Sequence, residues 1–117
     1  MLPASYRLRR RNDFDRVYRR GSARAGKAFV LYCKRSSGQA VRIGFSVSKK
    51  FGKAVQRNRI KRQLRHAVLE ELESFRPGCD YVVVVRRAAA GLTYQQMREA
   101  LAQLAAAFSD PEEARRG

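Results

Sequence analysis

The stretch "SVSKKFGKAVQRNRIKRQLRHAVLEELESF", Ser46 to Phe75, carries the longest helical pattern of the chain. Its apolar residues recur three and four positions apart, which predicts a helix from about Val55 to Ser74 with one buried face. The residues of that face are Ile60, Leu64, Ala67, Val68, Leu72 and Phe75. A helix with one apolar stripe must pack on another element, so the flanking segments decide the fold.

The same stretch separates its charges along the helix. Between Lys49 and Arg65 it holds eight Lys and Arg residues and no carboxylate, and three glutamates follow from Glu70 to Glu73. This order opposes the helix dipole, and cations three or four residues apart repel one another. A charged helix is usually solvated and stabilised by ion pairs between residues three or four positions apart. Here the cations have no carboxylates at that spacing, because the acids come only at the end of the helix. Phosphate groups near the helix N-terminus would stabilise it, because unpaired N–H groups and clustered cations attract them.

The cations of this helix form two rows when they are projected at 100° per residue. One row consists of Arg57, Lys61 and Arg65, with Asn58 nearby, and the other of Arg59, Arg62 and His66. Before the helix, Gly52 would let a phosphate approach the backbone closely. The two rows point in different directions, so we expect them to do different jobs, although which row faces which partner stays open.

The composition of the whole chain favours a polyanionic partner. The 117 residues carry a formal net charge of +16, from 26 Lys and Arg against 10 Asp and Glu. Such a charge favours nucleic acid, because neutralising phosphates releases condensed counterions. An anionic membrane surface is the alternative, but the longest apolar run, "YVVVV", is far too short to span a bilayer. RNA is favoured over duplex DNA because no helix-turn-helix, zinc finger or basic zipper is recognisable.

Upstream of the stretch, the chain predicts one helix and two strands. "NDFDRVYRRG" is typical of a short helix capped by Asn12 and ended by Gly21. "KAFVLYCKR" and "VRIGFSVS" predict strands joined by the turn "SSGQ". The second strand alternates, with Val41, Ile43, Phe45 and Val47 toward the core and Arg42, Gly44, Ser46 and Ser48 toward a polar face. The small residues of that polar face should leave room for a ligand.

Downstream, "PGC" ends the long helix and "DYVVVVRR" predicts a central strand covered on both faces. Thr93 begins the last helix with a capping box. The core stripe of that helix is Tyr94, Met97, Leu101, Leu104 and Phe108. The order helix, strand, strand, helix, strand, helix predicts a single compact α+β domain over residues 1–117, with a small sheet packed against helices. About six N-terminal and nine C-terminal residues should be frayed.

The sequence offers little for catalysis or metal binding by the chain alone. Cys33 and Cys79 form no CxxC pair, and with His66 as the only histidine a zinc site is hard to assemble, so we expect two buried free thiols. No spaced carboxylate pair with a base is recognisable, and His66 among cations is more typical of an RNA-facing surface. No oxygen ligands cluster, so magnesium would have to arrive with RNA phosphates. The start of the chain lacks the apolar core of a signal peptide, which favours the cytoplasm.

The segment "SVSKKFGKAVQRNRIKRQLRHAVLE" closely resembles the bacterial ribonuclease P protein component, whose hallmark Arg-Asn-Arg motif is Arg57, Asn58 and Arg59 here. The likeness extends to "LRRRNDFDRVYRRG", "FVLY", "DYVVVVRR" and "LTYQQM", which together cover most of the chain. The resemblance implies a small basic subunit that joins a catalytic RNA to remove the 5′ leader of precursor tRNA. It implies that the RNA and its magnesium ions carry the chemistry, and that the crossover through the long helix is left-handed.

By position, the resemblance assigns two sets of residues. Docking on the catalytic RNA would involve Arg57, Asn58, Arg59, Lys61, Arg62 and Arg65. The leader cleft would be lined or rimmed by Phe14, Tyr18, Tyr32, Lys49, Lys50, Lys53, Arg86 and Arg87. Tyr18 departs from the family pattern, in which an aromatic such as Phe is expected, so its hydroxyl must find water or a polar partner.

The three rings of that set would form a stacking platform for a single-stranded leader. Phe14 and Tyr18 lie four apart on a short helix, and Tyr32 alternates away from Phe29 and Leu31 toward the polar face. The alternative is that the rings are simply core. For the whole chain, the alternatives are a ribosomal or RNA-chaperone protein, which would bind RNA without stimulating cleavage, and a self-sufficient nuclease, for which no site is recognisable.

Overall fold

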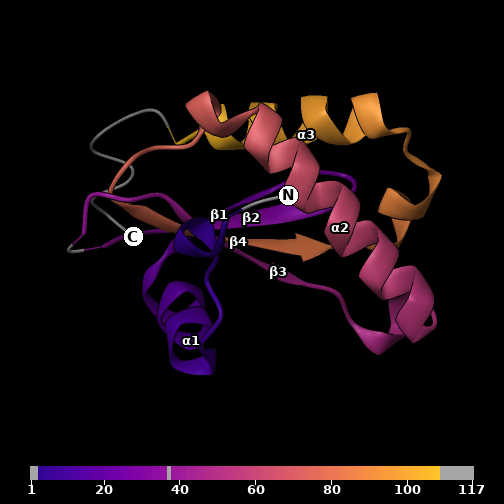
Figure 1. Ribbon diagram of the computed structural model, residues 1–117, viewed down its shortest axis with the longest axis horizontal. Coiled ribbons are helices and arrows are strands. Elements are labelled where there is room, and N and C mark those ends of the chain that lie inside the picture. The colour runs from indigo at the N-terminus through magenta and orange to yellow at the C-terminus, as the bar shows by residue number, and fades with distance from the viewer. Residues whose placement is uncertain (1–2, 37, 109–117) are drawn as a thin grey trace.

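The computed structural model describes residues 3–36 and 38–108, which form a four-stranded sheet with helices on both faces (Figure 1). In chain order the main elements are α1 (Arg11–Arg20), β1 (Ser22–Ala25), β2 (Phe29–Arg35), β3 (Arg42–Ser46), α2 (Ala54–Glu70), β4 (Cys79–Val85) and α3 (Tyr94–Ala106). Short 3-10 helices connect them, namely η1 (Ala4–Tyr6), η2 (Lys49–Phe51), η3 (Leu72–Ser74) and η4 (Arg87–Gly91). The predicted α+β class with one small sheet is confirmed.

The strands lie in the order β1-β2-β4-β3. β4 pairs antiparallel with β2, from Phe29↔Val85 to Arg35↔Cys79, and parallel with β3 on its other side. α2 therefore forms the crossover between two adjacent parallel strands. The left-handed sense that the resemblance implies for this crossover stays a prediction. At the outer edge of β3, the backbone N–H of Leu8 donates to the carbonyl of Ile43 at 3.0 Å, which ties the N-terminal segment to the sheet.

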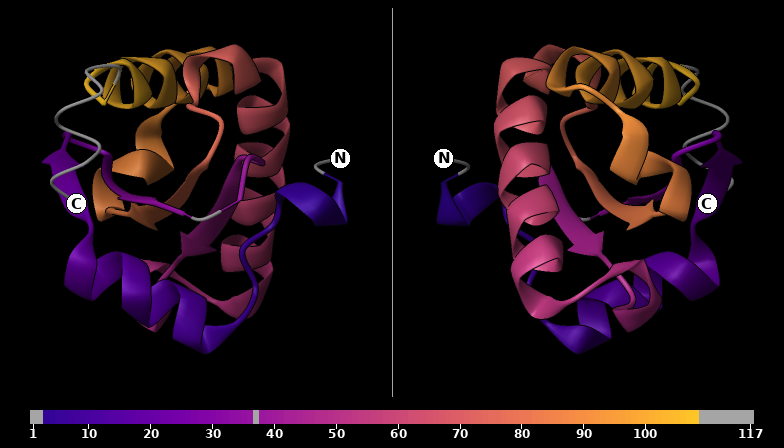
Figure 2. Two further views of the ribbon diagram at one scale, coloured as in Figure 1. Left: turned by 90° about the vertical axis from the view of Figure 1, so that its left-hand side faces the viewer. Right: turned by 90° about the vertical axis from the view of Figure 1, so that its right-hand side faces the viewer.

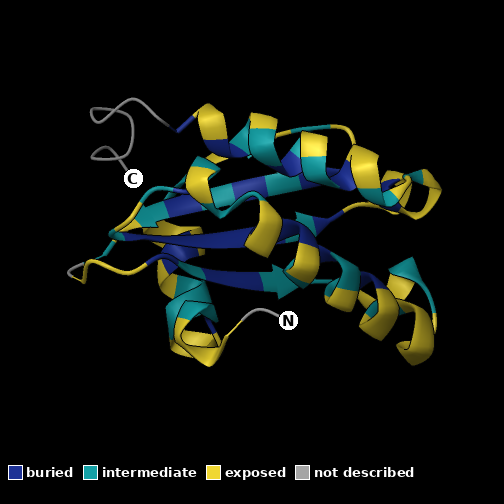
Figure 3. Cartoon of the chain, turned by 45° about the horizontal axis from the view of Figure 1, so that its top comes forward, coloured by how far each residue is buried: buried dark blue, intermediate teal, exposed yellow. Residues whose placement is uncertain are grey.

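β4 is buried on both faces, as its unbroken apolar run predicts (Figure 3). Tyr81 and Val83 face the larger core, which α2 and α3 cover. Val82 faces the other way and packs with Leu8 and Val17 beneath α1. α1 and α3 consequently lie on opposite sides of the sheet (Figure 2).

The structure contains one strand that the sequence did not predict. β1, with the sequence "SARA", pairs with β2 from Ser22↔Cys33 to Ala25↔Val30. Four small or polar residues carry no strand periodicity of their own. β1 forms because β2 supplies a ladder of backbone partners next to the end of α1.

The predicted ends of two helices were wrong. α1 begins at Arg11 rather than after an Asn12 cap, and the residue before it, Arg10, makes no side-chain cap. α2 ends at Glu70, and the predicted last turn is the separate 3-10 helix Leu72–Ser74. Phe75 is still buried, because this 3-10 turn carries it back to the core.

Two predicted helix ends are confirmed. The N–H of Gly21 donates to the carbonyl of Val17 at 2.9 Å at the end of α1. A Cβ at this position would lie 2.4 Å from that carbonyl oxygen, so glycine is required there. At α3, the N–H of Gln96 donates to Thr93 Oγ1 at 3.1 Å, and the Thr93 N–H donates to the Gln96 side chain at 2.9 Å.

The cysteines and the chain termini were also the subject of predictions from the sequence. Cys33 and Cys79 are buried free thiols, as predicted. Within the N-terminal segment, Ala4–Tyr6 form a 3-10 turn, whereas position 37 of the predicted turn and the tail 109–117 lie outside the described residues. Across the described part of the chain, no helix combines the length and apolarity needed to cross a membrane.

Candidate nucleic-acid interface

The two cationic rows of α2 differ in burial. Arg57, Lys61 and Arg65 are all partly buried. Arg59, Arg62 and His66 are all exposed, as is Asn58. The helix turns Ile60, Leu64, Ala67 and Val68 into the core, so the rows lie on opposite flanks of that buried stripe. The predicted separation of the cations into two surfaces is therefore confirmed, and the role of each row stays a prediction.

The partly buried row lies toward the N-terminal segment and β3. Arg57 Nη1 donates to the carbonyl of Gly52 at 2.7 Å, which holds this side chain against the start of the helix. Burial lowers the pKa of the Arg65 guanidinium, and the positive charge of Arg7 lowers it further. Like charges are thus brought together on this flank.

At the N-terminus of α2, Gly52 does not leave the space for a phosphate that the sequence predicted. The Gln56 side-chain oxygen accepts from the Lys53 N–H at 2.8 Å, and a Cβ on Gly52 would lie 2.2 Å from that same oxygen. The space above Gly52 is therefore occupied by Gln56 rather than left for a phosphate. The exposed Lys49, Lys50 and Lys53 surround this helix end.

The acids at the other end of α2 are used within the fold. Glu70 and Glu71 each lie 3.6 Å from a guanidinium nitrogen of Arg98 on α3, and the Tyr94 hydroxyl donates to Glu70. Burial and this hydrogen bond raise the pKa of Tyr94 to about 12. By contrast, none of the eight Lys and Arg residues from 49 to 65 forms an ion pair with a described residue. Glu70 and Glu71 thus tie the C-terminal end of α2 to α3, whereas the cations before and along its first turns have no such partner among the described residues.

Phe14, Tyr18 and Tyr32 form one contiguous group, which we call the aromatic cluster. The ring centroids of Phe14 and Tyr18 are 6.5 Å apart, and those of Tyr18 and Tyr32 are 5.0 Å apart with an edge-to-face angle of 85°. Phe14 and Tyr32 are partly buried against the small core beneath α1, while Tyr18 is 36% exposed. The sequence left open whether these rings are core residues or a binding surface. Phe14 and Tyr32 pack partly into the core, whereas Tyr18 also reaches the surface.

The small residues opposite this cluster accommodate its own side chains. A Cβ on Gly44 would lie 2.3 Å from the Phe14 ring, so the glycine makes space for that ring rather than for a ligand. Burial raises the Tyr18 pKa above its ordinary value, and the Ser46 side chain beside the hydroxyl partly offsets this rise. Ser46 is therefore the polar partner that this hydroxyl required.

Four of the five remaining residues of the predicted leader cleft lie at one end of the sheet, and the fifth, Lys53, is at the start of α2. Lys49 and Lys50 follow β3, and Arg86 and Arg87 follow β4. Because β3 and β4 are parallel, the segments that follow them leave at the same edge. All four side chains are exposed, and Arg86 Nη1 also donates to the carbonyl of Gly26 at 3.0 Å.

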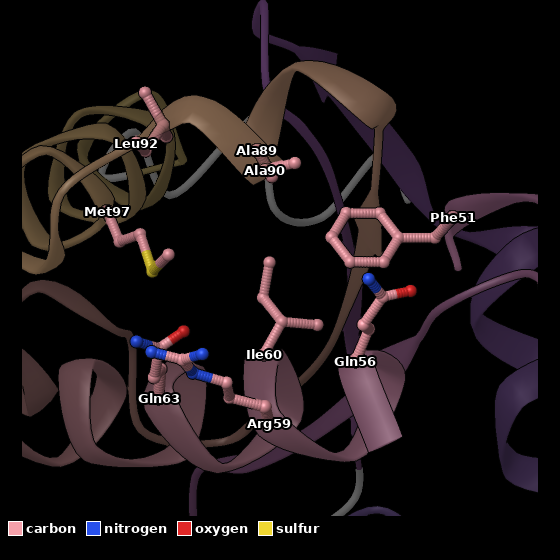
Figure 4. A pocket seen from close by; sticks show the side chains of 9 residues that line it. All are labelled: Phe51, Gln56, Arg59, Ile60, Gln63, Ala89, Ala90, Leu92 and Met97. Carbon is pink, nitrogen blue, oxygen red and sulfur yellow. The ribbon is translucent and has the colours of Figure 1, made fainter. Parts of the chain in front are cut away.

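Sequence reasoning missed a pocket beside Arg59, which we call the Arg59 pocket (Figure 4). It has a volume of about 310 Å³ and lies between α2, η2, η4 and the start of α3. Its lining consists of Phe51, Gln56, Arg59, Ile60, Gln63, Ala89, Ala90, Leu92 and Met97. The only local signal was the spacing of Gln56, Arg59 and Gln63 on one face of the helix.

A second missed feature lies on the flank of α1 away from Tyr18. A hollow of about 520 Å³ there has as its charged lining Arg16, Arg20, Lys34, Arg35, Arg42 and Asp80. Asp80 is only 2% exposed and accepts two hydrogen bonds from Arg42, at 2.9 and 2.8 Å. Arg42, predicted to lie on an open polar face, is instead held by a carboxylate of the neighbouring strand.

Among residues 3–36 and 38–108, no group of three or more His, Cys, Asp or Glu side chains could hold a metal ion. His66 borders an exposed hollow with Arg62, Gln63, Glu70 and Tyr94. The described residues therefore offer cations, amides and rings for binding.

Comparison with known proteins gives a consistent result in sequence and in structure. A family model described as ribonuclease P matches residues 2–109. The ribonuclease P protein component of Geobacillus kaustophilus is 44% identical over 101 residues, covering 86% of this chain and 84% of that protein. That of Bacillus velezensis is 40% identical over 99 residues, covering 84% of each.

Solved structures agree with these sequence matches. The RNase P protein of Staphylococcus aureus is 34% identical with a TM-score of 0.77, covering 85% of this chain and 91% of that one. The RNase P protein of Thermotoga maritima is 29% identical with a TM-score of 0.81, covering 89% of this chain and 98% of that one. The likeness extends over most of the described fold.

Proposed function

This chain belongs to the ribonuclease P protein family, and we propose that it docks on the catalytic RNA through α2 and holds the 5′ leader of precursor tRNA at the aromatic cluster. Family membership makes it the protein component of a ribonucleoprotein endoribonuclease that processes tRNA, with the RNA subunit as its partner. The assignment of surfaces to the two RNAs is our proposal.

The observation that carries RNA docking is the unpaired charge of α2 and of the segment just before it. Eight Lys and Arg residues lie between Lys49 and Arg65, and none forms an ion pair with a described residue. Phosphates of a structured RNA would relieve their mutual repulsion and release counterions. The motif residues Arg57, Asn58 and Arg59 lie in the first two turns of this helix, where the helix dipole also favours an anion.

The proposal for the leader rests on the aromatic cluster and the cations beyond it. Unpaired bases stack on rings regardless of their identity, which suits a protein that must accept many leaders. Tyr18 offers the most exposed ring, and Tyr32 supports it from the sheet. Lys49, Lys50, Lys53, Arg86 and Arg87 would hold the leader phosphates.

We assign the hydrolysis to the RNA and its magnesium ions. The described part of the chain offers no cluster of metal ligands, so the magnesium ions would be held by RNA phosphates. The protein's own contribution is to bind both RNAs and to position the leader, which lowers the entropic cost of bringing the cleavage site to the catalytic RNA. We expect this complex to act in the cytoplasm.

Reconstitution tests this function directly. The catalytic RNA is assayed on precursor tRNA at physiological magnesium, with and without the full chain. We expect the chain to stimulate cleavage. RNA binding without stimulation would instead support a ribosomal or RNA-chaperone role, and cleavage by the chain alone would support a self-sufficient nuclease.

A further inference from the structure

The Arg59 pocket is preformed by buried side chains from separate parts of the chain. Its floor contains Ile60, Ala89 and Met97, which are 4%, 0% and 3% exposed. Phe51 and Leu92 are partly buried and pack against the same core. The walls come from α2 on one side and from η4 and α3 on the other (Figure 4). Its volume of about 310 Å³ lies at the lower end of the range for small-ligand sites.

Three polar side chains from α2 edge this apolar floor. Gln56, Arg59 and Gln63 are three and four residues apart and line the pocket together. The Gln56 oxygen is engaged by the Lys53 N–H at 2.8 Å, which fixes its amide at the pocket edge. Among the described residues, the side chains of Arg59 and Gln63 have no hydrogen-bond or ion-pair partner.

This combination of groups matches the chemistry of a nucleobase. An unstacked base needs a ring or an aliphatic surface against its face, which Phe51 and the floor supply. The edge of a purine accepts from an arginine or pairs with a side-chain amide, as the guanine and adenine contacts of Arg and Gln illustrate. An apolar side chain of a protein partner would fill the floor but leave Arg59 and Gln63 without partners, which is costly when they are desolvated.

The position of the pocket indicates where such a base would come from. It opens beside the exposed cationic row of α2, where Arg62 lies next to Gln63. Phosphates on either side of an extruded nucleotide could contact those cations while the base enters the pocket. We propose that the Arg59 pocket binds one unstacked purine base of the catalytic RNA on which α2 docks. This proposal rests on the proposed function, because it assumes that docking.

Two alanines of η4 provide a matched pair of variants. Ala90 and Ala88 are both exposed, but only Ala90 lines the pocket. Ala90→Trp fills the pocket without changing the charge, and Ala88→Trp adds the same side chain outside it. Gln63→Leu is a second pocket variant, which keeps the approximate size of the side chain and removes its amide. Thermal unfolding checks that all three variants fold as the parent chain does.

The measurement is chemical probing of the catalytic RNA bound to the full-length chain. Dimethyl sulfate and kethoxal report the base edges, and hydroxyl radicals report the backbone. We expect the parent chain and Ala88→Trp to protect the same single unpaired purine. Ala90→Trp and Gln63→Leu should lose that protection while keeping the backbone footprint. Ala90→Trp should weaken affinity by at least about fivefold, the lower end of what one stacked base contributes.

The salt dependence of binding separates this pocket from general electrostatics. Because Ala90→Trp removes no charge, its plot of log affinity against log salt should run parallel to that of the parent chain. Identical base protection in the parent chain and Ala90→Trp would overturn the proposal, as would an equal loss in Ala88→Trp. If the parent chain stimulates cleavage, but Ala90→Trp and Gln63→Leu protect the same base as the parent chain, only the pocket proposal is refuted. If the parent chain does not stimulate cleavage, the proposed function itself fails.

Discussion

Tyr18 shows how a single residue can belong both to the fold and to a binding surface. Its ring contacts Tyr32, its hydroxyl contacts Ser46, and it is still 36% exposed. We predict that Tyr18→Ala weakens precursor tRNA binding by roughly tenfold, because stacking of one base contributes about 1 to 3 kcal/mol. Mature tRNA, which has no leader, should bind as before. Equilibrium binding of the two tRNAs to the holoenzyme measures the difference.

Tyr18→Phe is the matched control, because it keeps the ring and removes only the contact with Ser46. It should bind precursor tRNA almost as well as the parent chain. An equal loss of affinity for both tRNAs in Tyr18→Ala, or unfolding of that variant, would mean that the ring is a core or docking residue.

Among the ion pairs on the α1 face, the pair of Asp80 and Arg42 should contribute most to the free energy of unfolding. Asp80 is 2% exposed, so Arg42→Met would leave a buried carboxylate without its two hydrogen bonds. Breaking a fully buried pair costs about 3 to 5 kcal/mol; we expect about 2 to 3 kcal/mol here, because solvent screens a partly exposed arginine. Urea unfolding measures this change in the free energy of unfolding.

The double variant Arg42→Met with Asp80→Leu tests whether the two residues act as a pair. Apolar replacement of both partners should recover most of the lost stability. If the double variant is as unstable as the sum of the two single variants, the two side chains are not energetically coupled.

At the scale of the element, the two flanks of α2 should serve different RNAs. We compare two double variants that remove the same charge. The first combines Arg59→Gln and Arg62→Gln on the exposed row, and the second combines Lys61→Gln and Arg65→Gln on the partly buried row. The first double variant should mainly weaken binding to the catalytic RNA. The second should also weaken precursor tRNA binding, because its row lies toward β3 and the N-terminal segment. Equal losses from both double variants in both binding assays would show that the rows are not functionally distinct.

The charge order of α2, unfavourable for an isolated helix, is explained by its two neighbours. Its acidic end is fixed to α3 through Arg98 and Tyr94, and its core stripe holds the middle on the sheet. Packing of this kind outweighs an unfavourable dipole interaction of a few tenths of a kcal/mol to about 1 kcal/mol per charge. The basic end can then remain unpaired within the fold and available to RNA.

At the scale of the whole molecule, the net charge of +16 predicts the salt dependence of binding. Log affinity for the catalytic RNA should fall linearly with log salt, by about 0.7 to 0.9 for each phosphate neutralised, giving a slope of several units. Titration at a series of potassium concentrations and fixed magnesium measures it. A nearly flat plot would contradict an interface built on phosphates.

The sheet connects the two proposed RNA surfaces. Ser46, at the end of β3, contacts Tyr18, and the chain then continues through Lys49 and Lys50 into α2. The two surfaces are therefore joined by a short, regular part of the fold rather than by a linker. This arrangement would hold a leader at a fixed distance from the docked catalytic RNA.

The sequence by itself determined the elements whose signals are local. The buried stripe of α2, the capping box at Thr93 and the two-sided burial of β4 all followed from periodicity or from neighbours three to four residues apart. The cationic rows were equally readable, because helical geometry fixes which residues share a flank. The aromatic cluster could be predicted as a group only through the family resemblance.

Tertiary structure alone decided the features that join distant segments. β1 exists through pairing with β2, Phe14 fills the space above Gly44, and Arg42 is held by Asp80 across two strands. The Arg59 pocket likewise combines α2 with the segment around Ala89. The physical reason is that local pattern specifies which face of an element is buried, whereas which side chains meet there depends on how the packed elements fill space.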